Sequence, residues 1–367
     1  MKRHISAAGA LAVAITMTIV GLAAAPAGAA SGWFNEYSGT DIQVNGTFKP
    51  IVGDFNGGDQ DDIIWYAPGA ATDYLWTSTG SSFTKTTLSK QVSSTFTPIV
   101  GDFGGDNFDD ILWYAPGPAP DYLWITSNGN FTQKTMSVSG TYQPFVLPDN
   151  TYGGGSLDDI VWYAPGSAAD SIWNFNTAQG GHATQAITVP GSPKPVVGDY
   201  DGNGFADILW YNPGTTADSL WRRTTDGGPF TATPQTINGT FTPVVQLFTA
   251  DHTDERSDIL WFASGAAGDS LWEGKADGSF IKTSHAISDT GTPLGLIYDW
   301  GYTYTWNPSG PDRVWYDNVS GPDHDEDALN TEIPAGYTPL VGNFNDDGSV
   351  PAIFWYKAGS ATEYLFY

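Results

Sequence analysis

The sequence contains no cysteine and few basic residues. Its 367 residues include 14 Lys and Arg against 40 Asp and Glu, which gives a formal net charge of −26. Without cysteine there are no disulfide bonds and no thiol chemistry, so stability must come from a large core, a bound metal, or both. The excess of negative charge repels phosphate backbones and counts against nucleic-acid binding. We expect cations, neutral polymers or basic proteins as partners.

Long apolar stretches are also missing, apart from one run near the N-terminus. Lys2 and Arg3 precede a mostly apolar run over residues 7–25, and Ala27-Gly28-Ala29 then supplies the small residues after which a signal peptidase cleaves. We expect residues 1–29 to be a signal peptide, the protein to be secreted, and no membrane contact after the signal is removed. The alternative is a retained membrane anchor.

Turn-forming and aromatic residues are abundant. The 44 Gly, 24 Pro and 14% aromatic residues predict many short strands joined by tight turns. The segment Asp62-Ile63-Ile64-Trp65-Tyr66 recurs along the chain in seven copies, of which the last two are weaker. The anchoring tryptophans are Trp65, Trp113, Trp162, Trp210, Trp261, Trp315 and Trp355, at spacings of 48, 49, 48, 51, 54 and 40 residues. This period is typical of propeller blades.

Each unit is predicted to contain four strands, which in the second unit span residues 96–103, 111–114, 121–125 and 131–138. Such a sheet cannot bury both faces alone, and a ring of seven lets each sheet cover its neighbours. We therefore predict an all-β fold, a seven-bladed β-propeller of four-stranded antiparallel blades, in a single domain over residues 30–367. The last unit ends after a third strand, so residues 34–44 are expected to complete that blade and close the ring.

The loop between the first two strands of the fourth unit carries oxygen side chains at positions 1, 3, 5 and 9. These are Asp199, Asp201, Asn203 and Asp207, and the carbonyl of Phe205 offers a further oxygen. Calcium favours six to eight oxygens that converge from alternate positions of a tight loop. The alternative is that the acids only cap turns by accepting backbone N–H bonds.

With these loops the chain resembles the FG-GAP or VCBS-type repeat family, which includes integrin α-subunit heads, over residues 32–367. The resemblance implies a seven-bladed propeller with calcium in the loop between the first two strands of a blade. The family's Gly-Ala-Pro element stands here as Ala-Pro-Gly, as in Ala67-Pro68-Gly69, which indicates a divergent branch. The resemblance places further calcium ligands at Asp54, Asn56 and Asp62 in unit one and at Asp102, Asp106 and Asp110 in unit two. Units three, five, six and seven lack a complete set, and we expect no tight site there.

An acid stands eight residues after each anchoring tryptophan. These acids are Asp73, Asp121, Asp170, Asp218, Asp269, Asp323 and Glu363. They are expected on the face opposite the calcium loops, beside aromatic residues such as Tyr74 and Tyr122. A carboxylate next to a ring face can bind a sugar, because the acid accepts hydroxyl hydrogen bonds and the ring covers C–H groups. The alternative is that each acid bonds turn amides.

The sequence shows no catalytic motif. The histidines after the predicted signal peptide, His182, His252, His285 and His324, lie in different units without paired spacing, and neither a His-Glu-x-x-His segment nor a Gly-x-Ser-x-Gly elbow occurs. We expect a secreted calcium-binding protein that recognises an extracellular ligand, above all carbohydrate, through repeated shallow sites whose multivalency raises avidity. The alternatives are a protein-interaction or adhesion module and, less favoured, an enzyme that cleaves polysaccharide with paired carboxylates.

Overall fold

The computed structural model describes residues 42–366 except 59, 81, 150–156, 167, 249–255, 266–267, 286, 288, 297–302, 309, 317–324, 329–332 and 346–351. Regular structure in this part of the chain consists of 27 strands in seven antiparallel sheets. No helix in it is long and apolar enough to cross a membrane. We number the sheets as blades one to seven in chain order.

The strands of the seven blades have the following bounds. They are β1 Lys49–Gly53, β2 Asp62–Tyr66, β3 Tyr74–Ser78 and β4 Phe83–Thr87 in blade one; β5 Thr97–Gly101, β6 Asp110–Tyr114, β7 Asp121–Ser127 and β8 Asn130–Met136 in blade two; β9 Gln143–Leu147, β10 Asp159–Tyr163, β11 Asp170–Thr177 and β12 Gly181–Ile187 in blade three; β13 Lys194–Gly198, β14 Asp207–Tyr211, β15 Asp218–Arg222 and β16 Thr231–Gln235 in blade four; β17 Thr242–Gln246, β18 Asp258–Phe262, β19 Asp269–Gly274 and β20 Phe280–His285 in blade five; β21 Thr292–Gly295, β22 Thr303–Trp306, β23 Arg313–Tyr316 and β24 Asp325–Ala328 in blade six; and β25 Thr338–Gly342, β26 Ala352–Tyr356 and β27 Tyr364–Phe366 in blade seven.

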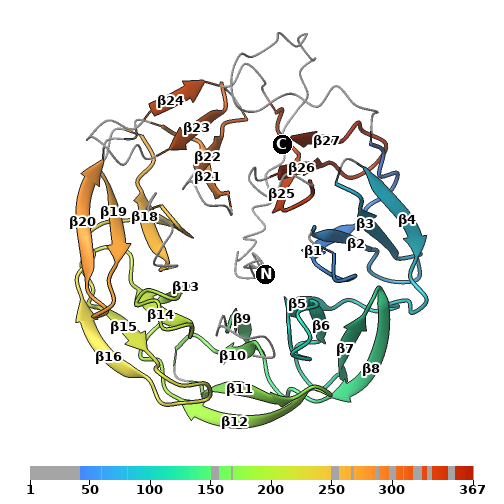
Figure 1. The fold of residues 1–367 in the computed structure, drawn as a ribbon, viewed down its shortest axis with the longest axis horizontal. Helices are drawn as coiled ribbons and strands as arrows, with labels where there is room; N and C mark the ends of the chain where they lie inside the picture. Colours follow the sequence, from blue (N-terminus) through green and yellow to red (C-terminus); the bar gives the residue numbers. More distant parts are fainter. Residues whose placement is uncertain are drawn as a thin grey trace.

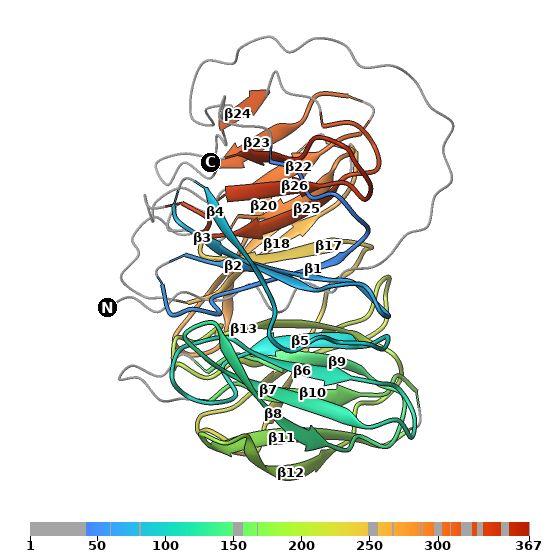
Figure 2. The same ribbon diagram turned by 90° about the vertical axis from the view of Figure 1, so that its right-hand side faces the viewer.

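The blades stand around a central axis, each with its first strand innermost and its last strand at the rim (Figure 1). Figure 2 shows the same ring from its edge. The first strands are in contact in five pairs of neighbouring blades, including β1 of blade one with β25 of blade seven. The predicted all-β, seven-bladed fold is confirmed, with four described strands in six blades and three in the seventh.

The second strands form the core of the ring. Every residue of β2, β6, β10, β14, β18 and β26 is buried, because each strand lies inside its sheet and neighbouring blades cover both faces. Trp113 contacts Trp124 of its own blade at a ring-centroid distance of 5.2 Å and Tyr66 of the preceding blade at 5.0 Å. The second-strand tryptophans therefore fill the wedge between blades.

The N-terminal segment lies beside the last blade. Ile42 forms an antiparallel bridge with Glu363. The equivalent pair in blade two is Asp121 with Met136, the last residue of the fourth strand. Gly46 likewise bridges Gly359. Residues 42–46 therefore occupy the place where a fourth strand ends, as the predicted ring closure requires. Residues 34–41, the rest of the predicted strand, lie outside the described residues.

Blade six corrects the predicted position of one anchoring tryptophan. In blade one Pro50 faces Trp65 across the first two strands, and in blade six Pro293 faces Thr305. Thr305 therefore takes the place of the second-strand tryptophan, while Trp315 lies in the third strand β23. The prediction that Trp315 stands in a second strand is wrong. Both strands of a blade place an acid three residues before a tryptophan, so the pattern alone does not separate them.

Candidate functional site

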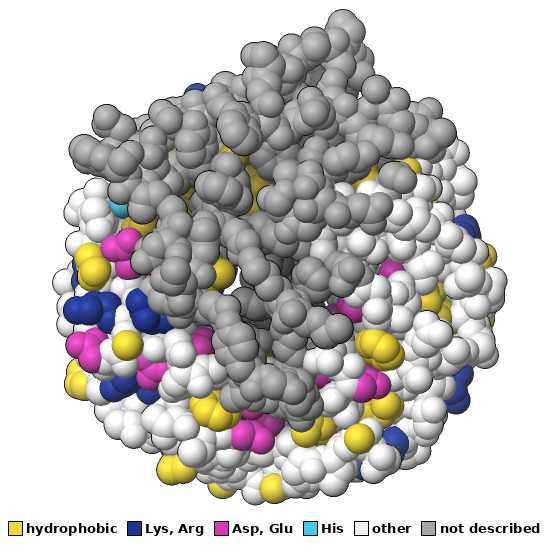
Figure 3. Space-filling view, viewed as in Figure 1, with side chains coloured by type: hydrophobic (Ala, Val, Ile, Leu, Met, Phe, Trp, Pro, Cys, Tyr) yellow, Lys and Arg dark blue, Asp and Glu magenta, His cyan; other side chains and the backbone are white. Residues whose placement is uncertain are grey.

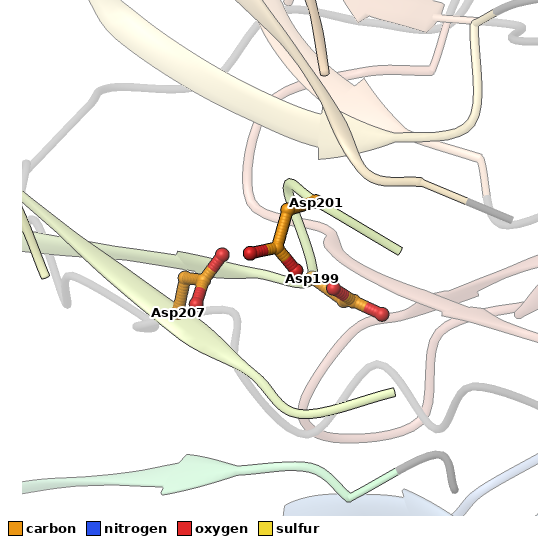
Figure 4. A group of neighbouring side chains, drawn as sticks. All are labelled: Asp199, Asp201 and Asp207. Carbon is orange, nitrogen blue, oxygen red and sulfur yellow. The ribbon is translucent and has the colours of Figure 1, made fainter. Parts of the chain in front are cut away.

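The first loop of blade four brings three carboxylates together. Each of Asp199, Asp201 and Asp207 offers an oxygen within 4.8 Å of the others. Figure 4 shows Asp201 and Asp207 turning their carboxylates toward each other, with Asp199 beside them. The loop holds this shape because Asp199 accepts N–H bonds from Gly202 at 2.8 Å and Gly204 at 2.7 Å.

The electrostatics of this cluster favour a cation. Burial raises the pKa of Asp207 to about 8, and the neighbouring Asp201 and Asp199 add to the rise. Burial also raises the pKa of Asp199, with a further contribution from Asp201. These shifts show the cost of holding ionised carboxylates together in a partly buried loop. A bound divalent cation would remove that cost, and an all-oxygen donor set suits calcium.

Two other predicted ligands of this loop already hold contacts. The Asn203 side-chain oxygen accepts the Phe205 N–H at 2.8 Å, and its amide nitrogen donates to the Arg223 carbonyl at 2.9 Å. Phe205 forms an isolated antiparallel bridge with Asp149. In addition, Arg222 Nη1 lies 3.4 Å from Asp201 Oδ2, so a positive charge already borders the cluster.

In blade one the predicted ligands converge less fully. Asn56 donates its amide N–H to both oxygens of Asp62 at 2.8 Å, while its own oxygen accepts the Gly58 N–H. Asp54 accepts N–H bonds from Asn56 and Gly57. Burial raises the pKa of Asp62 to about 8 and that of Asp54 to about 6.

In blade two one predicted ligand is a buried acid with a free oxygen. Asp110 Oδ1 accepts the Thr126 N–H at 2.7 Å, whereas Oδ2 has no hydrogen-bond partner. Burial raises the pKa of Asp110 to about 9, with Asp102 and Asp106 contributing. Among the described residues, only the three acids of blade four bring one carboxylate oxygen each within 4.8 Å of the other two. The carboxylates of Asp102, Asp106 and Asp110 do not come this close together.

The acid at position 9 also has a role that does not depend on a metal. One oxygen accepts the N–H at the end of the third strand in each of five blades. The pairs are Asp62 with Ser78, Asp110 with Thr126, Asp159 with Phe175, Asp207 with Arg223 and Asp258 with Gly274. Blade five keeps this bond although its loop has no acid at position 1 in the sequence. The acid at position 9 therefore satisfies a backbone N–H of the third strand, and its other oxygen could still bind a metal ion.

The acids that stand eight residues after the anchoring tryptophans are buried and hydrogen-bonded in blades one to five. Asp73, Asp121, Asp170, Asp218 and Asp269 each expose 3% or less of their surface. Each accepts one N–H before its turn and one after the fourth strand, at 2.6–3.0 Å. The donors are Ala67 and Val92, Ala115 and Val138, Ala164 and Val189, Asn212 and Ile237, and Ala263 and Ile287, respectively. This geometry favours the turn-capping alternative over contact with a sugar.

Two more blades place an acid in a similar role. Glu363 accepts the Val44 N–H at 2.9 Å, which ties the N-terminal segment to blade seven. In blade six Asp312 bonds the N–H groups of Asn307 and Ile333 at 2.7 and 3.2 Å. Asp312 thus fills the role predicted for Asp323, which lies outside the described residues.

Tyr74 and Tyr122, predicted to stand beside the acids, are half-buried. The ring of Tyr74 packs edge-on against Phe48 at 6.1 Å, and that of Tyr122 against Phe96 at 5.9 Å. Lys85 Nζ lies 4.3 Å from the centre of the Tyr74 ring. These rings keep part of their surface in solvent at the seams between blades.

Figure 3, which shows the face seen in Figure 1, places a group of Lys and Arg side chains over the side of blades four and five.

Sequence reasoning missed a repeated contact between neighbouring blades. Asp109, at position 8 of its loop, accepts the Asp54 N–H at 2.9 Å and returns its own N–H to the Asp54 carbonyl at 2.8 Å. Equivalent pairs are Asp158 with Asp102, Ser257 with Asp199, and Asp61 with Asn343. The last pair joins blade one to blade seven. The signal in the sequence was Gly53, since a Cβ there would lie 2.6 Å from Asp109 Oδ2.

A tyrosine at the end of the second strand forms a second contact that was missed. Tyr114 Oη donates to the Gly140 carbonyl and accepts the Tyr142 N–H, both at 2.9 Å. Tyr356 bonds Gly46 and Phe48 in the same way. This tyrosine therefore holds the segment that leads into the next blade, and Tyr356 holds the N-terminal segment.

Comparison with known proteins supports the fold. No family model and no curated protein matches the chain, so the resemblance to FG-GAP or VCBS-type repeats is not confirmed. The chain is similar to an Agrocybe aegerita lectin described as recognising non-reducing terminal N-acetylglucosamine, with 15% identity, a TM-score of 0.60 and 86% of each chain covered. It is also similar to part of the Photorhabdus luminescens Tc holotoxin pore, with 14% identity, a TM-score of 0.44 and coverage of 81% of this chain and 16% of that one. The likeness to the lectin supports a propeller fold.

Proposed function

We propose that this protein is a secreted, calcium-binding propeller that recognises an extracellular carbohydrate. The observation that carries the calcium part is the convergence of Asp199, Asp201 and Asp207 in one loop. The raised pKa of Asp207, caused by burial and by its acidic neighbours, supports a cation there. Calcium supplies no reaction in this proposal. It neutralises the loop and stabilises blade four.

The test uses Asp201→Asn. Asp201 carries fewer of the loop's hydrogen bonds than Asp199, so the metal site can be weakened with little damage to the fold. Chelation should lower the Tm of the wild-type protein, because a ligand at a hundredfold excess over Kd contributes about 2.7 kcal/mol. The substitution should remove most of this response while leaving the Tm in chelator nearly unchanged. Asp277→Asn, an exposed acid in another loop, is the matched control.

Two results would contradict the calcium part. A wild-type Tm that is the same with and without chelator would exclude calcium as a stabilising ligand. An equal chelator response in wild type and Asp201→Asn would place the metal elsewhere. Isothermal titration calorimetry on the chelated protein gives the number of ions bound and separates these cases.

The carbohydrate part is supported by the fold shared with a sugar-recognising lectin and by half-buried tyrosines at the seams. Since the turn acids are bonded to backbone amides, Tyr74 and Tyr122 are the better candidates for sugar contact. A ring can cover the apolar C–H face of a sugar while leaving its hydroxyls in water. Repeated weak sites on one rigid ring would raise avidity toward a glycan or cell-wall polymer.

A glycan array in calcium tests this part. Binding to a set of related glycans, weakened by Tyr74→Ala and Tyr122→Ala together at unchanged Tm, is the expected result. Silence on the array combined with co-purification of one protein partner would favour an adhesion module instead.

A further inference from the structure

Blade three keeps a buried acid although its loop lacks an acid at position 1. Asp159 faces Leu147 across the first two strands, as Asp207 faces Gly198 in blade four. Its residue surface is fully buried, and Oδ1 accepts the Phe175 N–H at 3.0 Å. In blades one, four and five the second oxygen of this acid accepts a loop N–H, from Phe55, Tyr200 and Phe248 respectively.

In blade three the second oxygen takes a different partner. Arg223 Nη1 of blade four lies 2.6 Å from Asp159 Oδ2, and the two side chains expose 1% and 0% of their surface. The residues equivalent to Arg223 in blades one, two, three and five carry no charge: they are Ser78, Thr126, Phe175 and Gly274. Within these five described blades, the only guanidinium at this position therefore faces the neighbouring loop that lacks its first acid.

The backbone of Arg223 is fixed within the loop of blade four. Its N–H donates to Asp207 Oδ1 at 3.3 Å, and its carbonyl accepts the Asn203 amide at 2.9 Å. The side chain crosses to blade three, where Nε and Nη2 are buried and have no hydrogen-bond partner among the described residues. A buried guanidinium with unused donors is costly unless a carboxylate neutralises it. The pair is therefore held together by charge rather than by a full set of hydrogen bonds.

We propose that Arg223 is a built-in cation that does in blade three what a metal ion does in blade four. Its guanidinium, supplied by the neighbouring blade four, neutralises the buried carboxylate of Asp159, so blade three needs no divalent cation. The comparison with blade four rests on the proposed calcium site. The charge pairing in blade three does not, and the two are tested separately.

The test is a double-mutant cycle with Arg223→Met and Asp159→Asn, measured by thermal unfolding with and without chelator. Arg223→Met should lower the Tm by several degrees, because it leaves a buried carboxylate unpaired. The double variant should lose clearly less than the two single losses combined, since neither partner is then left charged. Lys275→Met, at an exposed basic residue in a loop of blade five, is the control and should have a small effect. Added calcium should restore the Tm lost to chelation but not the Tm lost to Arg223→Met.

Additive losses in the cycle, or an Arg223→Met protein that melts like wild type, would overturn the proposal. So would full recovery of Arg223→Met by calcium, because blade three would then bind the metal itself. A chelator response absent from wild type and variant alike would refute only the calcium site of blade four. If Arg223→Met is insoluble, Arg223→Lys and Arg223→Gln replace it. A more stable Lys variant supports the charge role, and equal stability overturns it.

Discussion

Many acidic side chains in this ring cap backbone N–H groups, and among the described residues only Asp199, Asp201 and Asp207 bring three carboxylates close together. Asp207 and Asp258 occupy the same position in their blades and bond the same third-strand N–H. They differ in their neighbours, because Asp207 has Asp199 and Asp201 within reach. The sequence could separate these two loops, since the acids at positions 1 and 3 are visible in it. It could not show that the position-9 acid is needed in both.

The turn acids give a prediction at the scale of one residue. Asp121→Ala should lower the free energy of unfolding by about 2–5 kcal/mol, because the buried N–H groups of Ala115 and Val138 lose their acceptor. Asp277→Ala, at an exposed acid, should stay within about 0.5 kcal/mol of wild type. Chemical denaturation measures both. Loss of polysaccharide binding by Asp121→Ala at unchanged stability would instead assign this acid to the ligand.

His182 gives a prediction about pH. Its ring stacks on Trp173 at a centroid distance of 4.0 Å, and burial lowers its pKa below the ordinary value of 6.5, with Lys134 adding to the shift. Because the unfolded chain then binds a proton more readily than the folded one, this residue's contribution is present above pH 6.5 and is lost as the pH falls. The Tm difference between wild type and His182→Gln should therefore move against wild type from pH 7.5 to pH 5. A difference that is constant over this range would contradict the burial argument.

At the scale of strands, the repeated acid and tryptophan pattern predicted the four-stranded antiparallel blades. It gave a wrong strand assignment in blade six, because the second and third strands carry the same motif. Asp62 stands three residues before Trp65 in the second strand, and Asp73 stands three residues before Trp76 in the third. When Thr305 replaces the second-strand tryptophan, the remaining acid and tryptophan of blade six fit either strand. Pairing across the sheet decides the assignment, and a linear pattern does not contain it. The contacts between blades were missed for the same reason, because their partners lie 55 to 58 residues apart, and 282 apart where blade one meets blade seven.

The tyrosine contact gives a prediction about single elements. Tyr356→Phe removes the hydrogen bonds to Gly46 and Phe48. Tyr114→Phe removes the two equivalent hydrogen bonds between blades two and three, to Gly140 and Tyr142. Each change should cost about 1–2 kcal/mol. Hydrogen exchange should separate them: the amides of residues 42–48 should exchange faster in Tyr356→Phe and remain protected in Tyr114→Phe. Equal exchange of this segment in both variants would argue against its role in closing the ring.

At the scale of the whole molecule, closure depends on two ends that meet only in the folded state. Blade seven has three described strands of its own, and the segment before blade one adds further contacts to it. These are the Ile42 and Gly46 bridges, the bond to Glu363 and the contact with Tyr356. The Asp61 and Asn343 pair joins the same two blades on the loop face. The closing contacts among the described residues are noncovalent, as a chain without cysteine requires.

Deletion of residues 31–47 tests this closure. The variant would lose every contact of residues 42–46, leave the buried Glu363 without its Val44 donor and expose the edge of β27. An unpaired strand edge recruits other strands, so we expect aggregation and a Tm well below that of the full chain. Removal of residues 1–30 alone is the control and should leave the melting unchanged, because the segment that closes blade seven is kept. A soluble, monomeric deletion variant with the control's Tm would show that the ring closes without this segment, since three strands would then suffice for blade seven.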